Sequence, residues 1–167
     1  MPALLEPRTF PDYLSALRVG YEEEISGEAY FARLASFHHG RAKAALSLLA
    51  EVERATETVV RPLIQRHRLA TKSADALRRE GRSEADHRRD MSWPALLEDM
   101  VTNFPVFVTE LEAVEHLVPP ADRPQLRLLT AHEVAAVRFA TRETAGDPDS
   151  FKPLEDYLAA CAMHAGA

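Results

Sequence analysis

Four long stretches of the sequence carry an apolar residue at every third or fourth position, and this spacing limits the fold more than any other feature. They cover about residues 11–37, 41–66, 93–117 and 125–145. Such spacing puts the apolar side chains on one face of an α-helix, because the helix turns once every 3.6 residues. Glycine is scarce, at six residues, and no Asn-Gly or Asp-Gly hairpin signal occurs. The sequence therefore predicts an all-α protein.

The connections between these stretches predict how the helices are joined. About residues 67–92 are polar and basic, and we expect a crossover there with a short helix near residues 74–79. A terminal helix is expected at about residues 151–163, after the turn sequence GDPDS. Two helix pairs joined by one long crossover are one known connectivity of a four-helix bundle. We expect a single domain over residues 1–167, with the bundle at about residues 10–145.

Composition and charge exclude several classes of function. The formal net charge of −6 argues against non-specific nucleic-acid binding and is compatible with binding a cation. A single cysteine, Cys161, gives neither an internal disulfide nor a cysteine-based metal site. Charges interrupt every long apolar stretch, so no membrane partner is expected. The N-terminal segment lacks the regions of a signal peptide, and we expect a cytoplasmic protein.

Several glutamates fall on the apolar faces of the predicted helices. In VGYEEEISGEAYF, residues 19–31, a helical projection turns Glu24 and Glu28 inward and Glu22 outward. On the second helix, Glu53 lies within an otherwise apolar face. Burying an isolated charge costs several kcal/mol, so these inward carboxylates need a compensating partner.

The third and fourth predicted helices add further polar candidates. Glu115 falls on the inward face of the third helix and Glu112 at its edge, while His132 and Glu133 flank the centre of the fourth stripe. Neighbouring carboxylates raise one another's pKa, and the projected inward faces carry no Lys or Arg. The carboxylates must therefore share protons, open to water or bind a cation.

Four long helices, an inward Glu on each and a crossover after the second together resemble the ferritin-like superfamily, which includes rubrerythrin-type proteins. The resemblance covers about residues 10–145. It implies one Glu from each of two helices and a Glu-x-x-His from each of the other two, which together hold two iron or manganese ions. It assigns ligand roles to Glu28 or Glu24 on the first helix and to Glu112 or Glu115 on the third.

The sequence departs from this family pattern at both motif histidines. The motif that begins at Glu53 has Thr56 in the histidine position, and the motif that begins at Glu133 has Ala136 there. These small residues are expected to leave room beside a metal, and His132 is a candidate replacement ligand. A carboxylate-rich set with one His suits iron or manganese, as one ion or two. The candidate metal ligands are Glu24, Glu28, Glu53, Glu112, His132 and Glu133.

Three functional hypotheses remain open. The first is a ferritin-like metalloprotein whose iron or manganese serves an oxidoreductase that uses O₂ or peroxide. The second is a metal-free bundle that acts as a scaffold or partner-binding module, and a homodimer is expected from the fold class. The third is an acid-base enzyme with paired carboxylates. It ranks last because no phosphate loop, G-x-S-x-G or H-E-x-x-H motif is present.

Overall fold

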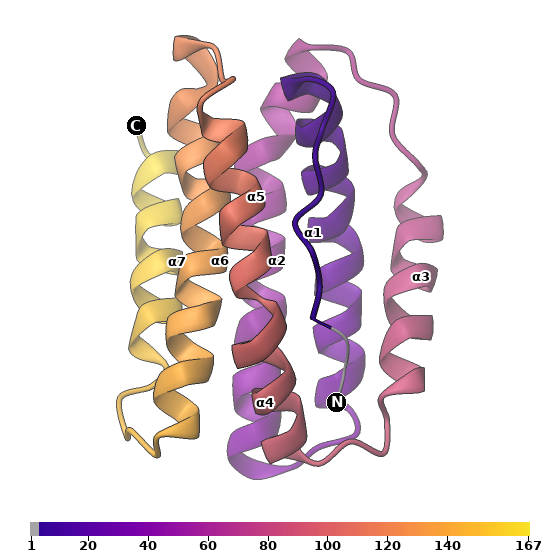
Figure 1. The fold of residues 1–167 in the computed structure, drawn as a ribbon, viewed down its shortest axis with the longest axis vertical. Helices are drawn as coiled ribbons and strands as arrows, with labels where there is room; N and C mark the ends of the chain where they lie inside the picture. Colours follow the sequence, from indigo (N-terminus) through magenta and orange to yellow (C-terminus); the bar gives the residue numbers. More distant parts are fainter. Residues whose placement is uncertain (1–3) are drawn as a thin grey trace.

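A computed structural model describes residues 4–167 as an all-helical protein, with no strand in that range (Figure 1). The expected all-α class is confirmed. Residues 1–3, which belong to the expected domain range, lie outside the described residues. The helices are α1 (Tyr13–Ala35), α2 (Gly40–Arg66), α3 (Ala74–His87), α4 (Trp93–Asn103), α5 (Pro105–Glu115), α6 (Arg123–Thr144) and α7 (Lys152–Ala165), with a 3₁₀ turn, η1 (Pro120–Asp122), before α6.

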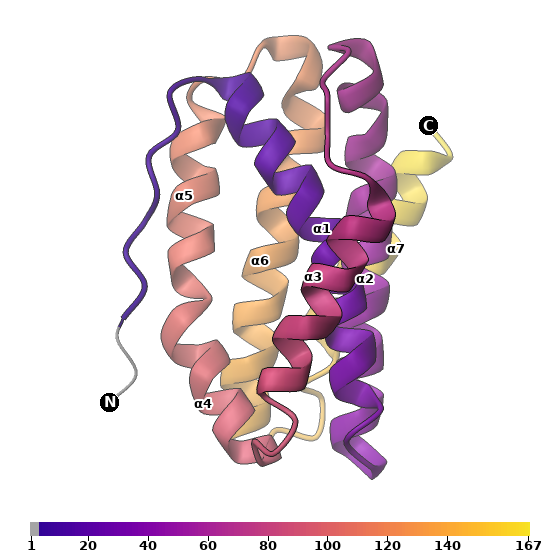
Figure 2. The ribbon, with the colours of Figure 1, turned by 90° about the vertical axis from the view of Figure 1, so that its right-hand side faces the viewer.

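The helices form a bundle whose long members run up and down one axis (Figures 1 and 2). In Figure 1, α1 descends, α2 rises beside it, and the crossover with α3 descends again on the outer side of α1. The consecutive helices α4 and α5 then rise, α6 returns, and α7 packs against α2 and α6. Among residues 4–167, no helix has both the length and the apolar character needed to cross a membrane.

Local sequence signals explain where the helices begin and break. The side chains of Asp12, Ser73 and Ser92 accept hydrogen bonds from the first turns of α1, α3 and α4, which satisfies amide groups that have no partner within the helix. The expected kink at Pro105 is confirmed, since α4 and α5 meet at Phe104. Proline lacks the amide hydrogen that a continuous helix would use at this point.

The crossover differs from the sequence expectation. Helix α3 continues well beyond the short helix expected at residues 74–79 and packs along α1. At Gly81 the two backbones approach so closely that an added Cβ would lie 2.0 Å from the Ser26 carbonyl oxygen. The crossover also covers Glu22, which the projection placed in solvent. Glu22 is buried and accepts a hydrogen bond from the Lys72 amide at 2.9 Å.

The apolar core is divided into two clusters along the bundle axis. One cluster lies towards the α4 end and is built around Leu46, Leu96 and Phe139. The other lies towards the η1 end and is built around Leu17 and Leu126. On α1 and α6 the inward polar residues Glu24 and His132 fall between these clusters along the chain, and on α2 Glu53 lies within the first cluster, next to Val52. The bundle therefore carries a polar layer at the middle of its height.

Asp122 joins three elements at the η1 end of the bundle. Its buried carboxylate accepts hydrogen bonds from the Tyr13 hydroxyl at 2.9 Å and from Arg66 Nη1 at 2.5 Å, and it pairs with His67 Nε2 at 2.5 Å. Burial opposes the charge of this carboxylate, but these partners outweigh burial and lower the pKa of Asp122. The charged form is therefore the one that the fold stabilises.

We expect Asp122→Asn to lower the free energy of unfolding by about 2 kcal/mol, the usual worth of hydrogen bonds to a charged group. Urea unfolding at neutral pH measures this free energy. Asp156→Asn is the matched control, because Asp156 is exposed and pairs only with Lys152 at 2.7 Å; its effect should stay below about 1 kcal/mol.

The difference in the free energy of unfolding between the wild type and Asp122→Asn should depend on pH in a defined direction. Because the pKa of Asp122 is lowered in the folded state, its stabilisation is complete above the ordinary Asp value of about 3.9 and is lost as the pH falls through the folded value. The gap between wild type and Asp122→Asn should therefore close in acid. A gap that widens as the pH falls would contradict the assignment.

Candidate metal centre

The polar layer brings together one side chain from each of three helices: Glu24 from α1, Glu53 from α2 and His132 from α6. Each offers one donor atom, and these atoms all lie within 4.8 Å of one another. Glu24 and His132 are only 3% and 2% exposed, while Glu53 is half-buried. Ligand atoms lie about 2 Å from a bound transition metal, so this grouping is close to the arrangement around a single ion.

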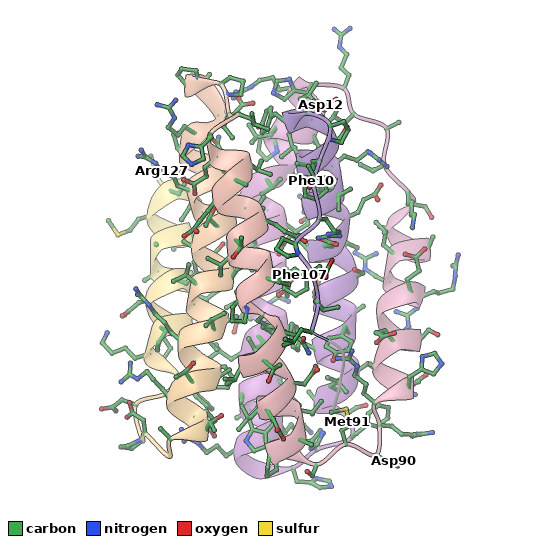
Figure 3. All side chains as sticks on the ribbon, viewed as in Figure 1. Phe10, Asp12, Asp90, Met91, Phe107 and Arg127 are labelled. Carbon is green, nitrogen blue, oxygen red and sulfur yellow. The ribbon has the colours of Figure 1, made fainter. Side chains whose placement is uncertain are left out.

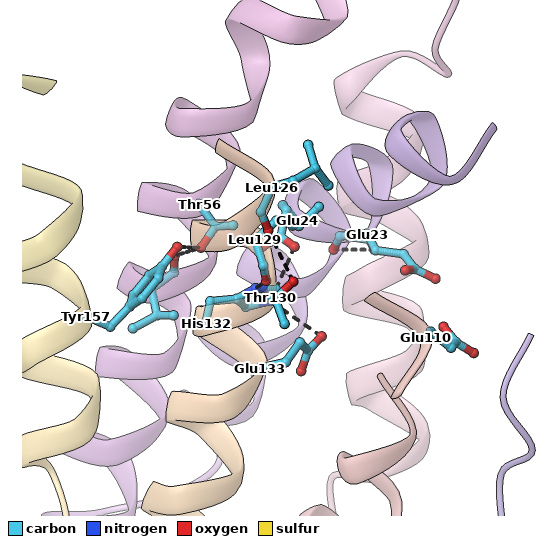
Figure 4. A network of polar contacts seen from close by, with 12 residues as sticks. Glu23, Glu24, Thr56, Glu110, Leu126, Leu129, Thr130, His132, Glu133 and Tyr157 are labelled. Atoms are coloured by element: carbon cyan, nitrogen blue, oxygen red, sulfur yellow. Dashed lines mark hydrogen bonds and ion pairs between the residues drawn. The ribbon is translucent and has the colours of Figure 1, made fainter. Parts of the chain in front are cut away.

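His132 is held in an orientation that suits a ligand. Its Nδ1 donates a hydrogen bond to the Leu129 carbonyl oxygen. This leaves Nε2 facing the carboxylates, 3.3 Å from Glu24 Oε1 and 3.4 Å from Glu133 Oε1 (Figure 4). A hydrogen bond from the far ring nitrogen is the usual way in which a metal-binding histidine is fixed.

One oxygen in this group has no partner. Glu24 Oε2 is buried and makes no hydrogen bond. Buried polar atoms are almost always paired, and an exception calls for a specific explanation such as an ion. A cation beside Glu24, Glu53 and His132 would supply the missing partner, so the residues present fit a metal.

Burial and mutual charge shift the protonation of all three groups. Burial raises the pKa of Glu24 well above its ordinary value and raises that of Glu53 to about 7, although the charge of His132 partly opposes both shifts. For His132, burial alone would lower the pKa, but the charges of Glu24, Glu133 and Glu53 outweigh it and raise the pKa well above the ordinary value. Protons therefore compete with a metal for these donors near neutral pH.

Gly27 makes room for the Glu53 side chain. A Cβ added at Gly27 would lie 2.5 Å from Glu53 Oε2 and 2.9 Å from its Cδ. Glycine inside a helix costs about 0.5–1 kcal/mol relative to alanine, and here it allows Glu53 to lie against α1. The sequence interpretation did not use Gly27, although a lone glycine within a helical pattern is a recognised signal of close approach.

The space beside the group is partly filled by α7. Thr56, which was expected to leave room next to a metal, lies 2.6 Å from the Tyr157 hydroxyl through its Oγ1. The Tyr157 ring is 6.3 Å from the His132 ring between centroids. Tyr157 therefore occupies the position beside Thr56, and the sequence interpretation missed it because it concentrated on the four long helices.

The structure brings together some of the candidate ligands and separates others. Glu24, Glu53 and His132 form the group, with Glu133 beside it at the more exposed edge. Glu28 is half-buried and lies outside the group, and Glu112 is exposed. On α5 it is Glu110, only 4% exposed, that is buried.

The inward face of α4 and α5 differs in part from the projection. Buried positions include Leu96, Leu97, Met100, Asn103 and Glu110, whereas the projection placed Glu115 on the inward face. Apolar residues occupy both sets of positions, as in LL at 96–97 and VFV at 106–108. The hydrophobic pattern therefore did not distinguish the two faces.

Glu110 is neutralised from outside the bundle by Arg8. Residues 4–11, which we call the N-terminal strap, run along α5 (Figures 1 and 2). The Arg8 guanidinium donates to Glu110 at 2.7 Å and to Glu23 of α1 at 2.5 Å. A void of about 20 Å³ lies beneath it, lined in part by Glu24 and His132. The strap thus links α1 to α5 beside the polar layer.

Comparisons of the chain with family models, curated proteins and solved structures give no significant match. The features of the ferritin-like resemblance that the structure supports are an all-helical bundle and a carboxylate–histidine group that could hold a metal ion.

Arg8→Ala should lower the free energy of unfolding by about 2 kcal/mol, because it leaves the buried Glu110 carboxylate without its charged donor. Arg8→Ala/Glu110→Leu should recover part of that loss, since it also removes the buried charge. Urea unfolding of both variants measures this. Arg54→Ala is the control, an exposed arginine 3.8 Å from Glu51; equal effects of Arg8→Ala and Arg54→Ala would refute the role of the strap.

Proposed function

We propose that this protein is a ferritin-like metalloprotein that binds one iron or manganese ion through Glu24, Glu53 and His132 and acts as an oxidoreductase with O₂ or peroxide. The observation that carries the proposal is the buried Glu24 Oε2, which lacks a partner within a group of three donor atoms. Two carboxylates and one imidazole suit iron and manganese, which favour oxygen-rich sites.

The path of the chain supports the ferritin-like assignment. Helices α1 and α2 form one antiparallel pair, α4–α5 and α6 form a second, and the crossover with α3 joins them along the length of the bundle (Figure 1). Among residues 4–167, the donors come from α1, α2 and α6 only. The buried carboxylate of α5, Glu110, is paired with Arg8 instead. The reduced donor set favours one ion over the two that the resemblance implies.

Each residue of the site has a defined task in this proposal. Leu129 fixes the His132 ring so that Nε2 offers a lone pair once its proton has left. Glu24 and Glu53 supply the negative charge that balances a cation. Glu133, whose side chain is 18% exposed, can carry a proton between His132 Nε2 and solvent. A bound ion would supply Lewis acidity and, as iron or manganese, one-electron chemistry.

A second candidate function is a metal-free helical scaffold. The observation that favours it is the position of His132 Nε2 between Glu24 and Glu133. A protonated His132 there would neutralise part of the layer without an ion. The homodimer and the cytoplasmic location stay predictions under either function.

We expect untagged protein, purified without chelator from cells supplied with iron and manganese, to carry about one ion per chain by elemental analysis. Glu53→Gln should weaken metal binding more than about tenfold, because it removes a direct ligand. Glu57→Gln is the matched control. Glu57 lies one turn further along α2, is also buried, and pairs with Arg61 outside the donor group.

Gly27→Ala tests the same site without touching a ligand. Its Cβ should displace the Glu53 carboxylate and lower metal affinity, while the alanine keeps the helix stable. Gly20→Ala is the control in the same helix, since its Cβ meets only the Leu129 side chain, at 3.3 Å. If elemental analysis finds no ion in the wild-type protein and chelator does not change its fold, the metal-free scaffold is favoured.

Metal affinity should rise with pH across the neutral range. The pKa values of Glu24, Glu53 and His132 are all raised, so the metal-free site holds protons that a metal must displace. Calorimetry of Mn²⁺ binding in buffers of different ionisation enthalpy should detect proton release. Metal binding that releases no protons near pH 7 would exclude His132 and Glu53 as ligands.

A further inference from the structure

A cavity of about 440 Å³ lies beside the candidate metal centre, bordered by α1, α3, α4–α5 and α6. It reaches Glu24, Glu53 and Glu133 and has the size of a small-molecule site. Four aromatic side chains contribute to its wall: Tyr30, Phe31, Phe104 and Phe107. Phe107, labelled in Figure 3, comes from α5. The wall therefore offers flat apolar surface near the polar layer.

The lining of this cavity is rich in acidic side chains. Six glutamates and one arginine, Arg88, contribute to its lining. Arg88 is already engaged, because it donates to the Tyr30 hydroxyl at 2.9 Å and to Asp99 at 3.0 Å and pairs with Glu84 at 3.3 Å. Three of the glutamates are paired with cations: Glu23 with Arg8, Glu80 with Lys72 and Glu84 with Arg88. The other three, Glu24, Glu53 and Glu133, lie at the inner end of the cavity beside His132. The cavity is therefore unsuited to an anionic ligand.

Both the aromatic and the acidic residues of this lining favour a cationic ligand. The face of an aromatic ring attracts an organic cation within about 6 Å, and carboxylates attract it by charge. At the inner end, Glu24, Glu53 and Glu133 supply these carboxylates, whereas Glu80 and Glu84 of α3 are already paired with Lys72 and Arg88. The unpartnered Glu24 Oε2, the same oxygen that the proposed metal site uses, gives the cavity a buried acceptor.

We propose that this cavity binds a small primary amine in its ammonium form, with an aromatic body, as the substrate of the neighbouring centre. The ammonium group lies against the carboxylates, and the aromatic body packs among Tyr30, Phe31, Phe104 and Phe107. As a substrate site the cavity rests on the proposed metal function; as a binding site it follows from its lining alone.

The test compares three probes of nearly equal shape by calorimetry: 2-phenylethylammonium, the neutral 2-phenylethanol and the anionic 3-phenylpropanoate. The wild-type chain is used after chelation and again with Mn²⁺ added. We expect the ammonium probe to bind about tenfold more tightly than the alcohol in both samples. Its affinity should fall with added salt, because salt screens the attraction between the ammonium group and the carboxylates. The propanoate should bind least.

Two variants separate ring recognition from general packing. Phe107→Leu keeps an apolar side chain but removes a ring face, so it should weaken the ammonium probe about threefold or more and leave the alcohol nearly unchanged. Phe37→Leu is the control, because Phe37 is a half-buried aromatic outside the cavity lining. If Phe107→Leu lowers the affinity for the ammonium probe and for the alcohol equally, Phe107 contributes only apolar packing. That result would overturn the proposed contact between the ammonium group and the ring.

The outcomes also separate this inference from the metal assignment. Mn²⁺ titration of the same samples reports the metal site independently. Ammonium binding in a protein that takes no Mn²⁺ would uphold the ligand class and remove the metal function. Absent ammonium binding, or tighter binding of the alcohol or the propanoate, would overturn the inference even if Mn²⁺ binds. If the propanoate binds most tightly of the three probes, and does so only when Mn²⁺ is present, the cavity binds carboxylate ligands instead.

Discussion

Two carboxylates and an imidazole lie together in the middle of the bundle, and the rest of the structure depends on keeping them there. Glu24 and His132 are almost fully buried, and Glu53 is half-buried. Charges in such a place need partners, because desolvation is costly and neighbouring carboxylates repel. The layer divides the apolar core into two clusters, so the fold gives up continuous packing to keep these groups together.

The surrounding elements position the layer and limit access to it. Gly27 allows Glu53 to lie against α1, and the Leu129 carbonyl holds the His132 ring. Tyr157 fills the α7 side through its contact with Thr56. The remaining open space lies on the side of α3 and α5, where the aromatic and acidic cavity is found. The architecture therefore directs small molecules to the layer from one side.

The sequence predicted those features of the fold and of the site that depend on the residues within one helix. The all-α class follows from apolar spacing, and Glu24, Glu53 and His132 were found because the faces around them are otherwise apolar. The buried carboxylate of α5 was placed wrongly because apolar residues lie on both sides of that helix. Glu22 was placed in solvent because the packing of α3 on α1 is a long-range contact. Arg8 carried no local signal at all.

The N-terminal strap has a consequence for the order of folding. Arg8 is made early in synthesis, yet its partner Glu110 lies 102 residues further along the chain. We expect such a non-local contact to form after the local helix pairs have assembled, because its two ends must first be brought together. The small void beneath Arg8, which Glu24 and His132 help to line, is therefore expected to be covered late in folding. Until then, a nascent or refolding chain exposes these two side chains to solvent on this side as well as through the larger cavity.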